Sequence, residues 1–284
     1  MINFENVSKS FKNNKVLTDI DLKIGRGQRV ALVGSNGAGK TTLIRCLLGE
    51  YSSKGVVTID GQDPREFREQ VLSKIGFVPQ LPPPLRMPVG QLVQFAASLC
   101  NSDQERMNNV AEKLGFDARR FKNHPFVKLS GGQKQKLLIS IALGRDSELL
   151  VMDEPAANLD PEARHILFEL LAEKQETAAM LISSHRLDEV SSLVNRVVEM
   201  DQGKIVLDDN VADLLDISSK LICSITMLQA NPAFAKTLSE WGFKMQDGDT
   251  NWSGFIAGPD RLKFLGMLSR YSALISGINM SESN

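Results

Sequence analysis

The sequence lacks the features that are typical of secreted, membrane-spanning or nucleic-acid-binding proteins. Its three cysteines, Cys46, Cys100 and Cys223, are far apart and odd in number, which predicts reduced thiols rather than disulfides or a metal site. No apolar run approaches the roughly 18 to 20 residues that span a bilayer, and residues 1–5 are not typical of a signal peptide. The formal net charge of −1 provides no basic field, so nucleic acid is not an expected partner. Together these absences predict a cytoplasmic protein.

What is present is enough apolar material for a substantial core. The chain has 284 residues, of which 42% are hydrophobic. That size and composition predict one large domain with a smaller appendage.

The most informative stretch is the glycine-rich loop GSNGAGKT, residues 34–41. Residues 28–33 before it predict a buried strand, and residues 41–48 after it predict a helix that ends at Gly49. A loop of the pattern G-x-x-x-x-G-K-[ST] in this setting is typical of phosphate binding, because its N–H groups and the helix N-terminus point at the anion. We expect Lys40 to reach the β- and γ-phosphates and Thr41 to hold Mg²⁺.

Two predicted strands end in side chains suited to phosphate chemistry. Residues 149–152 are apolar and lead directly into Asp153 and Glu154, and carboxylates at a buried strand end are costly unless they are used. Asp153 suits a Mg²⁺ contact, usually through water, and Glu154 suits the general base that polarises an attacking water. Residues 179–185 form another apolar strand that ends at His185, which can hydrogen-bond a γ-phosphate.

A third strand, residues 75–80, ends at Gln80. Ligands of open α/β sheets bind at strand ends, so Gln80 is a candidate contact for Mg²⁺ or water. Four prolines in the next segment, residues 81–88, exclude helix and central strand and predict a stiff hinge. Helical spacing returns at residue 89, and Ser102 and Asp103 indicate the start of a helix. Together they predict a helical insert that ends near Arg145.

A second glycine motif, Leu129 to Gln133, lies inside this insert. Ser130, Gly131, Gly132 and Gln133 head an apolar helix, which is consistent either with an anion-binding helix start or with a simple N-cap turn. A further cap is predicted at Asp160, which precedes Pro161 at the first helical position of a segment that extends to about residue 174.

The N-terminal region predicts antiparallel strands. Residues 2–7 and 16–24 alternate between apolar and polar, with Asn13 and Asn14 between them, and residues 56–61 predict a further strand and turn. Phe11 lies just before the first turn. Its ring is consistent with stacking on an adenine and equally with a half-buried strand position.

Taken together, residues 2–215 resemble the nucleotide-binding subunit of an ABC transporter. The resemblance depends on motifs that occur in the family's order: Phe11, the loop 34–41, Gln80, the signature LSGGQ at 129–133, Asp153-Glu154, Asn158-Leu159-Asp160 and His185. It implies an α/β P-loop NTPase fold with a RecA-like core, an antiparallel β subdomain and a helical subdomain at about 82–145. It also implies ATP and Mg²⁺ as cofactors and a head-to-tail homodimer, in which the signature of one subunit covers the γ-phosphate bound by the other.

The resemblance further implies a membrane-spanning permease partner, held by the segment after Gln80, and hence a peripheral position on the inner face of the cell membrane. The implied catalytic residues are Glu154, His185 and Gln80, and the implied metal contacts are Thr41, Gln80 and Asp153. The implied nucleotide contacts are Phe11, Val16, Ser35, Asn36, Gly37, Ala38, Gly39, Lys40, Thr41, Thr42, Ser130, Gly131, Gly132, Gln133 and Asp160. Ala156 and Phe11 depart from the family's usual threonine and tyrosine, but neither change removes a group that the chemistry needs.

Beyond about residue 208 the motifs end. Residues 221–228, 243–246, 252–257 and 273–278 predict strands, and 232–241 and 259–270 predict helices, in the order βαββαβ of a ferredoxin-like unit. We therefore predict an ABC ATP-binding domain at 1–215 and an α+β accessory domain at 216–284. A packing or dimer-stabilising appendage is favoured over a small-molecule sensor, because no catalytic constellation is present.

This appendage resembles the C-terminal extensions of ABC-2-type exporters, which makes export the expected direction of transport. The alternative function is a soluble ABC-type ATPase that acts on ribosomes or nucleic acid. The single nucleotide-binding domain, the lack of coiled-coil heptads and the near-neutral charge argue against it. An ATP-binding protein without turnover conflicts with the presence of Glu154 and His185.

Overall fold

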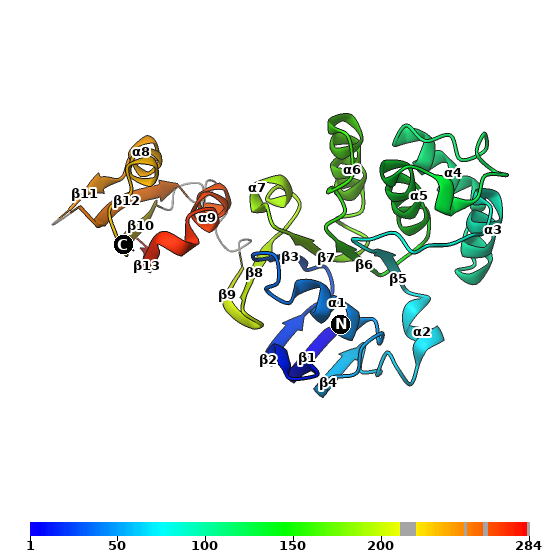
Figure 1. Ribbon diagram of the computed structural model, residues 1–284, viewed down its shortest axis with the longest axis horizontal. Coiled ribbons are helices and arrows are strands. Elements are labelled where there is room, and N and C mark those ends of the chain that lie inside the picture. The colour runs from blue at the N-terminus through cyan, green and yellow to red at the C-terminus, as the bar shows by residue number, and fades with distance from the viewer. Residues whose placement is uncertain (211–219, 247–248, 258–260, 283–284) are drawn as a thin grey trace. The chain divides into compact units, whose positions relative to one another are not determined.

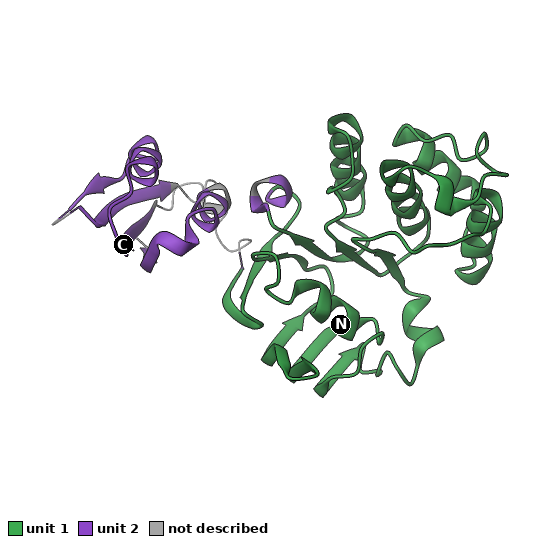
Figure 2. Cartoon of the chain, in the orientation of Figure 1, with its two compact units in different colours: residues 1–185, 192–209 green, residues 186–191, 210–284 purple. Residues whose placement is uncertain are grey.

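The computed structural model describes residues 1–210, 220–246, 249–257 and 261–282 (Figure 1). The chain divides into two compact units, residues 1–185 with 192–209 and residues 186–191 with 210–284 (Figure 2). The predicted boundary between residues 215 and 216 lies outside the described residues, and the division into domains at that point stays a prediction.

A six-stranded sheet forms the centre of the first unit. Its strand order is β5-β6-β7-β3-β8-β9, and the first five of these strands run parallel. Their bounds are Ile75–Val78, Leu149–Asp153, Ala179–Ser184, Arg29–Val33, Arg196–Asp201 and Lys204–Asn210. Every residue of β6 and β7 is buried, which is why their sequences are continuous apolar runs rather than alternating ones. The parallel direction brings the carboxyl ends of β3, β6 and β7 to one edge of the sheet.

A three-stranded antiparallel sheet of order β2-β1-β4 packs against this centre. Its strands are Asn14–Ile24, Ile2–Phe11 and Lys54–Ile59. The prediction that residue 14 lies in the turn is wrong, because Asn14 pairs with Phe11 and extends the ladder beyond the predicted start of the strand.

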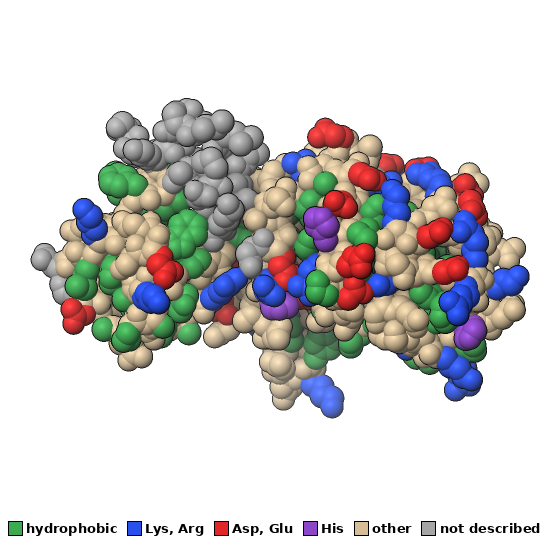
Figure 3. Space-filling model, turned by 90° about the horizontal axis from the view of Figure 1, so that it is seen from above, with side chains coloured by type: hydrophobic (Ala, Val, Ile, Leu, Met, Phe, Trp, Pro, Cys, Tyr) green, Lys and Arg blue, Asp and Glu red, His purple; other side chains and the backbone are tan. Residues whose placement is uncertain are grey.

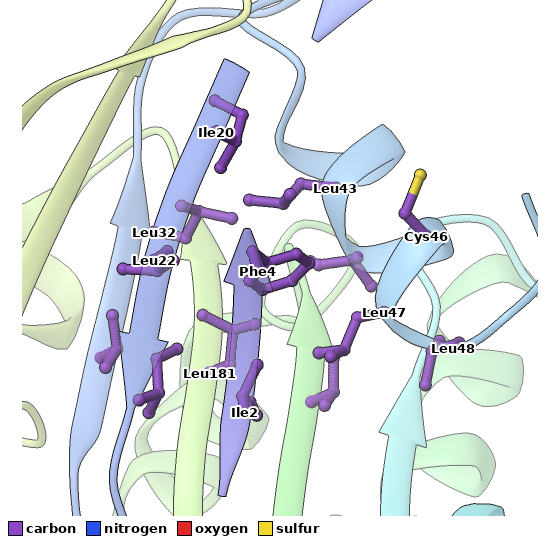
Figure 4. Close-up of a cluster of buried hydrophobic side chains, with 14 of the residues drawn as sticks. Ile2, Phe4, Ile20, Leu22, Leu32, Leu43, Cys46, Leu47, Leu48 and Leu181 are labelled. Carbon is purple, nitrogen blue, oxygen red and sulfur yellow. The ribbon is translucent and has the colours of Figure 1, made fainter. Parts of the chain in front are cut away.

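The core lies between these two sheets and helix α1, Lys40–Leu47. Figure 4 shows Leu43 and Leu47 of α1 beside Phe4 of β1 and Leu181 of β7. Helices α5, Gly131–Leu143, and α6, Pro161–Glu173, lie on the other side of the parallel sheet (Figure 1). This layered packing fixes the N-terminus of α1 against the edge of the sheet where β3 ends.

The segment predicted to be a helical insert forms a small core of its own. Helix α3 spans Val89–Leu99, α4 spans Gln104–Lys113, and both pack with α5. The predicted helix start is confirmed, because the Asp103 side chain accepts a hydrogen bond from the Glu105 N–H. The remaining short helices of the chain's described part are α2, Arg68–Leu72, α7, Leu187–Val190, and the 3₁₀ turns Phe126–Lys128 and Ser272–Leu274.

The second unit contains a four-stranded antiparallel sheet of order β11-β12-β10-β13. The strands are Lys244–Met245, Asn251–Ala257, Lys220–Met227 and Ile275–Glu282, and the helices are α8, Pro232–Glu240, and α9, Arg261–Ser269. The sequence order βαββαβ and this strand order confirm the ferredoxin-like prediction. The core of the unit includes stacked rings of Phe243 and Phe264, with centroids 5.0 Å apart.

In the part of the chain that the structure describes, no helix is both long and apolar enough to cross a bilayer. Acidic and basic side chains are intermixed on the face shown in Figure 3, in keeping with the formal net charge of −1.

Candidate functional site

The loop between β3 and α1 has a backbone that requires glycine. Gly34, Gly37 and Gly39 have φ values of +145°, +87° and +109°, which side-chain-bearing residues rarely adopt. A Cβ on Gly34 would lie 2.2 Å from the Met200 carbonyl oxygen, and one on Gly39 would lie 2.9 Å from Leu17 Cδ2. Gly34 and Gly39 therefore allow the loop to pack closely against its own unit, and Gly37 allows the backbone to turn.

Lys40 is buried at the start of α1 with its ammonium inside the loop. Nζ donates hydrogen bonds to the carbonyl oxygens of Gly34, at 2.6 Å, and Ser35, at 3.2 Å. Burial lowers the pKa of Lys40, while the charges of Glu154 and Asp153 oppose that decrease. The loop thus holds a positive charge where N–H groups of the helix N-terminus converge.

A cavity of about 260 Å³ opens directly on this loop. It brings together predicted residues from four separate parts of the sequence. The lining residues are Val16, Ser35, Asn36, Gly37, Ala38, Gly39, Lys40, Thr41, Thr42, Gln80 and Glu154. Backbone donors, one ammonium, hydroxyl groups and one carboxylate make a site suited to a polyphosphate.

Glu154 connects this cavity to His185. Its carboxylate is buried, with Oε1 3.8 Å from Lys40 Nζ and Oε2 2.7 Å from Nδ1 of His185. The backbone of Glu154 has a φ of +50°, in the left-handed region. The His185 side chain is 52% exposed, so one part of the ring faces Glu154 while another remains open to a ligand.

Ser183 was not among the predicted site residues, although it contacts two of them. Residue 183 pairs with Asp153 across β6 and β7. Its Oγ donates to Asp153 Oδ1 at 2.6 Å and accepts from the Glu154 N–H at 3.0 Å. The signal in the sequence was a hydroxyl within the polar end of an otherwise apolar strand.

The signature 129–133 does not line the cavity of its own chain. Ser130 and Gln133 form a capping box at the start of α5, with hydrogen bonds of 3.2 Å and 3.0 Å. A Cβ on Gly131 would meet no atom within 4 Å, whereas one on Gly132 would lie 3.1 Å from the Asn158 carbonyl oxygen. The N-cap interpretation describes the local geometry, and contact of this motif with nucleotide stays a prediction.

Phe11 is also outside the cavity lining. It is 41% exposed, its ring meets Tyr51 edge-on at 5.2 Å, and Lys9 Nζ lies 4.9 Å from its centroid. Val16, on the adjacent strand β2, does line the cavity. Stacking of Phe11 on an adenine therefore stays a prediction.

Asp160 caps helix α6 and also forms an ion pair with Lys136. Its side chain accepts a hydrogen bond of 2.9 Å from the Ala163 N–H and lies 2.8 Å from Lys136 Nζ. The hydrogen bond from Lys136 holds the pKa of Asp160 below its usual value. The pair joins the signature helix α5 to α6, and a role for Asp160 in nucleotide binding stays a prediction.

The residues predicted to hold Mg²⁺ offer hard oxygen donors, which this ion prefers. Thr41 and Gln80 line the cavity, and Asp153 is buried at the end of β6 with one carboxylate oxygen accepting from Ser183. Among the described residues, no group of three or more His, Cys, Asp or Glu side chains is placed to hold a metal ion. The donor set thus fits an ion whose remaining ligands come from nucleotide and water, as is usual for Mg²⁺.

Comparison with known proteins identifies the family. Residues 17–157 match the family described as ABC transporter. The chain is 35% identical to a putative ABC transporter ATP-binding protein of Methanosarcina mazei, over 76% of this chain and 39% of that protein. It is 32% identical to the Nod factor export ATP-binding protein I of Cupriavidus pinatubonensis, over 79% of this chain and 70% of that protein.

A further relative is the glutamine transport ATP-binding protein GlnQ of Escherichia coli K12, with 33% identity over 74% of this chain and 91% of the relative. A solved structure of an ATP-binding subunit of an ABC transporter has a TM-score of 0.67 and 26% identity, covering 75% of this chain and 91% of that one. These similarities confirm the resemblance that the motifs and the fold indicated. The chain belongs to the family of ABC transporter ATP-binding proteins.

Proposed function

We propose that the protein hydrolyses ATP and uses the reaction to drive transport through separate membrane-spanning partner chains. The observation that carries the proposal is the position of the buried Glu154 carboxylate between Lys40 of the phosphate loop and His185. A carboxylate at that point can act on a water molecule beside the terminal phosphate of a nucleotide in the cavity.

Each residue has a distinct task in this scheme. Lys40 and the loop N–H groups bind the β- and γ-phosphates, Glu154 polarises the attacking water, and His185 orients Glu154 and contacts the γ-phosphate. Thr41, Gln80 and Asp153 would hold Mg²⁺, which neutralises charge on the phosphates when it is bound. Catalysis of this type depends mostly on positioning and electrostatic stabilisation.

The proposal includes a head-to-tail homodimer with shared ATP sites. The support is that a Cβ on Gly131 would meet no other atom within 4 Å, so packing within one subunit does not require glycine at this position. A glycine at the N-terminus of α5 leaves the backbone N–H groups accessible to a phosphate from outside the chain. In the proposed dimer that phosphate belongs to the ATP bound by the other subunit.

Export is the proposed direction of transport, and it is supported by the C-terminal extension and by two relatives named for Nod factor export. Another relative is named for glutamine transport, without a stated direction. In the proposed assembly the protein is peripheral on the inner face of the membrane, attached through its permease partner.

The substitution Glu154→Gln tests the hydrolysis step. The amide keeps the shape of the side chain and removes its basicity, so kcat should fall at least about 100-fold while ATP binding persists. The matched control Glu66→Gln makes the same change on an exposed residue outside the site and should leave kcat unaltered. Near-normal hydrolysis by Glu154→Gln would reject the proposed chemistry.

Co-purification from cells tests the partner. A membrane-spanning chain that remains bound to the tagged protein through purification supports the transport function. A ribosome or nucleic acid in its place would contradict it and favour the soluble ATPase.

A further inference from the structure

We propose that Ser183 is a positioning residue that fixes the backbone of Glu154 and thereby aims its carboxylate. The inference rests on the proposed ATP hydrolysis, in which Glu154 is the general base. Ser183 does not itself line the cavity, whereas Glu154 does, so Ser183 acts through Glu154.

The hydrogen-bond directions at Ser183 are determined by its partners. An ionised carboxylate only accepts hydrogen bonds, so the single hydroxyl proton goes to Asp153 Oδ1, at 2.6 Å. A lone pair of the same oxygen then accepts the Glu154 N–H, at 3.0 Å. Because Ser183 has no exposed surface, water has no access to replace either bond. Asp153 thus orients the hydroxyl, and the hydroxyl holds Glu154.

The held residue is one whose backbone needs support. Glu154 has a φ of +50°, a conformation that residues other than glycine, asparagine and aspartate rarely adopt. Its N–H bonds both Ser183 Oγ and the Ser183 carbonyl oxygen, the latter at 3.2 Å, and its carbonyl accepts from the Ala157 N–H at 3.2 Å. Removal of the hydroxyl leaves the N–H with the longer bond alone.

This backbone turn determines where the Glu154 side chain lies. With the backbone in this conformation, Oε1 lies 3.8 Å from Lys40 Nζ and Oε2 lies 2.7 Å from His185 Nδ1. A change in the Glu154 backbone would move both contacts together. Small displacements of a general base reduce the rate strongly, because proton transfer needs hydrogen-bond distance in the transition state.

The first test is Ser183→Ala. We expect kcat to fall about 10-fold, the value expected when one hydrogen bond that supports the base is removed, while the affinity for ATP without Mg²⁺ changes less than about twofold. Ser183→Thr keeps the hydroxyl and should restore most of kcat. Ser140→Ala is the matched control, because Ser140 is equally buried but its hydroxyl donates to the Leu137 carbonyl of its own helix, away from Glu154.

A double-mutant cycle separates positioning from a general structural role. If Ser183 acts through Glu154, Ser183→Ala should not reduce the residual turnover of Glu154→Gln any further. An equal fold-decrease in both backgrounds, or unchanged kcat in folded Ser183→Ala, would overturn the inference. Thermal unfolding reports whether each variant is folded, and if Ser183→Ala is not, the cycle is run with Ser183→Cys, which has a similar volume and a weaker hydrogen-bonding group.

These outcomes are distinguishable from a failure of the proposed function. If Glu154→Gln hydrolyses ATP normally, the general base is wrongly assigned, and the proposed chemistry fails first. If Glu154→Gln is inactive while Ser183→Ala is folded and fully active, only the role of Ser183 is wrong.

Discussion

The phosphate loop and the signature loop both place glycines at the N-terminus of a helix, but they differ in what those glycines do. Helix α1 follows Gly39, whose backbone is in the left-handed region and which provides no side-chain cap. Helix α5 follows Ser130, which forms a complete capping box. A Cβ on Gly39 would collide with Leu17, while a Cβ on Gly131 would meet nothing within 4 Å. Packing within the subunit thus requires glycine at position 39 and not at position 131.

This contrast has a functional consequence. The phosphate loop opens on a cavity that its own chain completes with Gln80 and Glu154, whereas the signature lines no part of that cavity. A phosphate that contacts Gly131 would therefore lie outside the cavity of the same subunit.

The largest effect is expected for Lys40→Ala on the phosphate loop. The substitution removes the buried charge that the loop carbonyls hold, and ATP affinity should fall about 100-fold or more, because charge-assisted contacts to phosphate are strong. Calorimetric titration with ATP measures the change, and Lys244→Ala in the second unit is the control. Unchanged affinity would contradict the assignment of the phosphate loop.

The pair Gly39→Ala and Gly131→Ala tests the comparison itself. Gly39→Ala should destabilise the first unit by roughly 1–3 kcal/mol, because the new methyl group meets Leu17 at a positive φ. Gly131→Ala should leave the melting temperature unchanged or raise it, because alanine favours helix. Its cost should instead be seen in ATP-dependent dimerisation, measured by light scattering on a Glu154→Gln background.

Destabilisation by Gly131→Ala as large as that by Gly39→Ala would remove the contrast. Normal ATP-dependent dimerisation of a stable Gly131→Ala variant would show that the signature tolerates a methyl group where phosphate is expected.

A smaller effect is expected for Lys136→Met, which breaks the pair between α5 and Asp160. The melting temperature should fall by less than about 2 °C, because the carboxylate is exposed, and the difference should shrink at high salt. The lowered pKa of Asp160 means that the pair stabilises the fold above the usual pKa of 3.8 and loses this effect as the pH falls through the lower folded-state pKa. A melting-temperature difference that persists at the lowest pH and in high salt would mean that Lys136 stabilises the fold by packing.

The smallest effect is expected when the chain is ended after residue 216. The nucleotide cavity is lined only by residues of the first unit, so ATP affinity should change less than about twofold. Circular dichroism establishes that the shortened chain is folded. Loss of ATP binding by a folded truncated chain would mean that the second unit contributes to the site.

Much of the candidate site was predictable because its signals are local. The phosphate loop follows β3, Asp153 and Glu154 lie at the end of β6, and His185 follows β7. Parallel strands bring such ends to one edge of the sheet. The motifs marked Lys40, Glu154 and Gln80 as candidate site residues, and all three line one cavity. The ferredoxin-like unit was predictable for a similar reason, because each strand and helix of the order βαββαβ has its own local pattern.

What the sequence did not reveal depends on strand register and on backbone conformation. Ser183 lies beside Asp153 only because β6 and β7 pair in one particular register, and no local pattern specifies that register. The positive φ of Glu154 and the contact between Lys136 and Asp160 likewise arise from tertiary packing. These are the features that turn a list of motif residues into an oriented site.

ATP occlusion in mixed dimers tests directly whether each ATP site is shared between two subunits. One subunit carries Lys40→Ala and the other carries Gly131→Asp, which places a negative charge where the proposed γ-phosphate contact lies. If each site uses the phosphate loop of one subunit and the signature of the other, both lesions fall in one site and the second site is intact. Purified mixed dimers should then occlude ATP although neither parent homodimer does, and mixed dimers that form but occlude no more ATP than their parents would contradict the shared site.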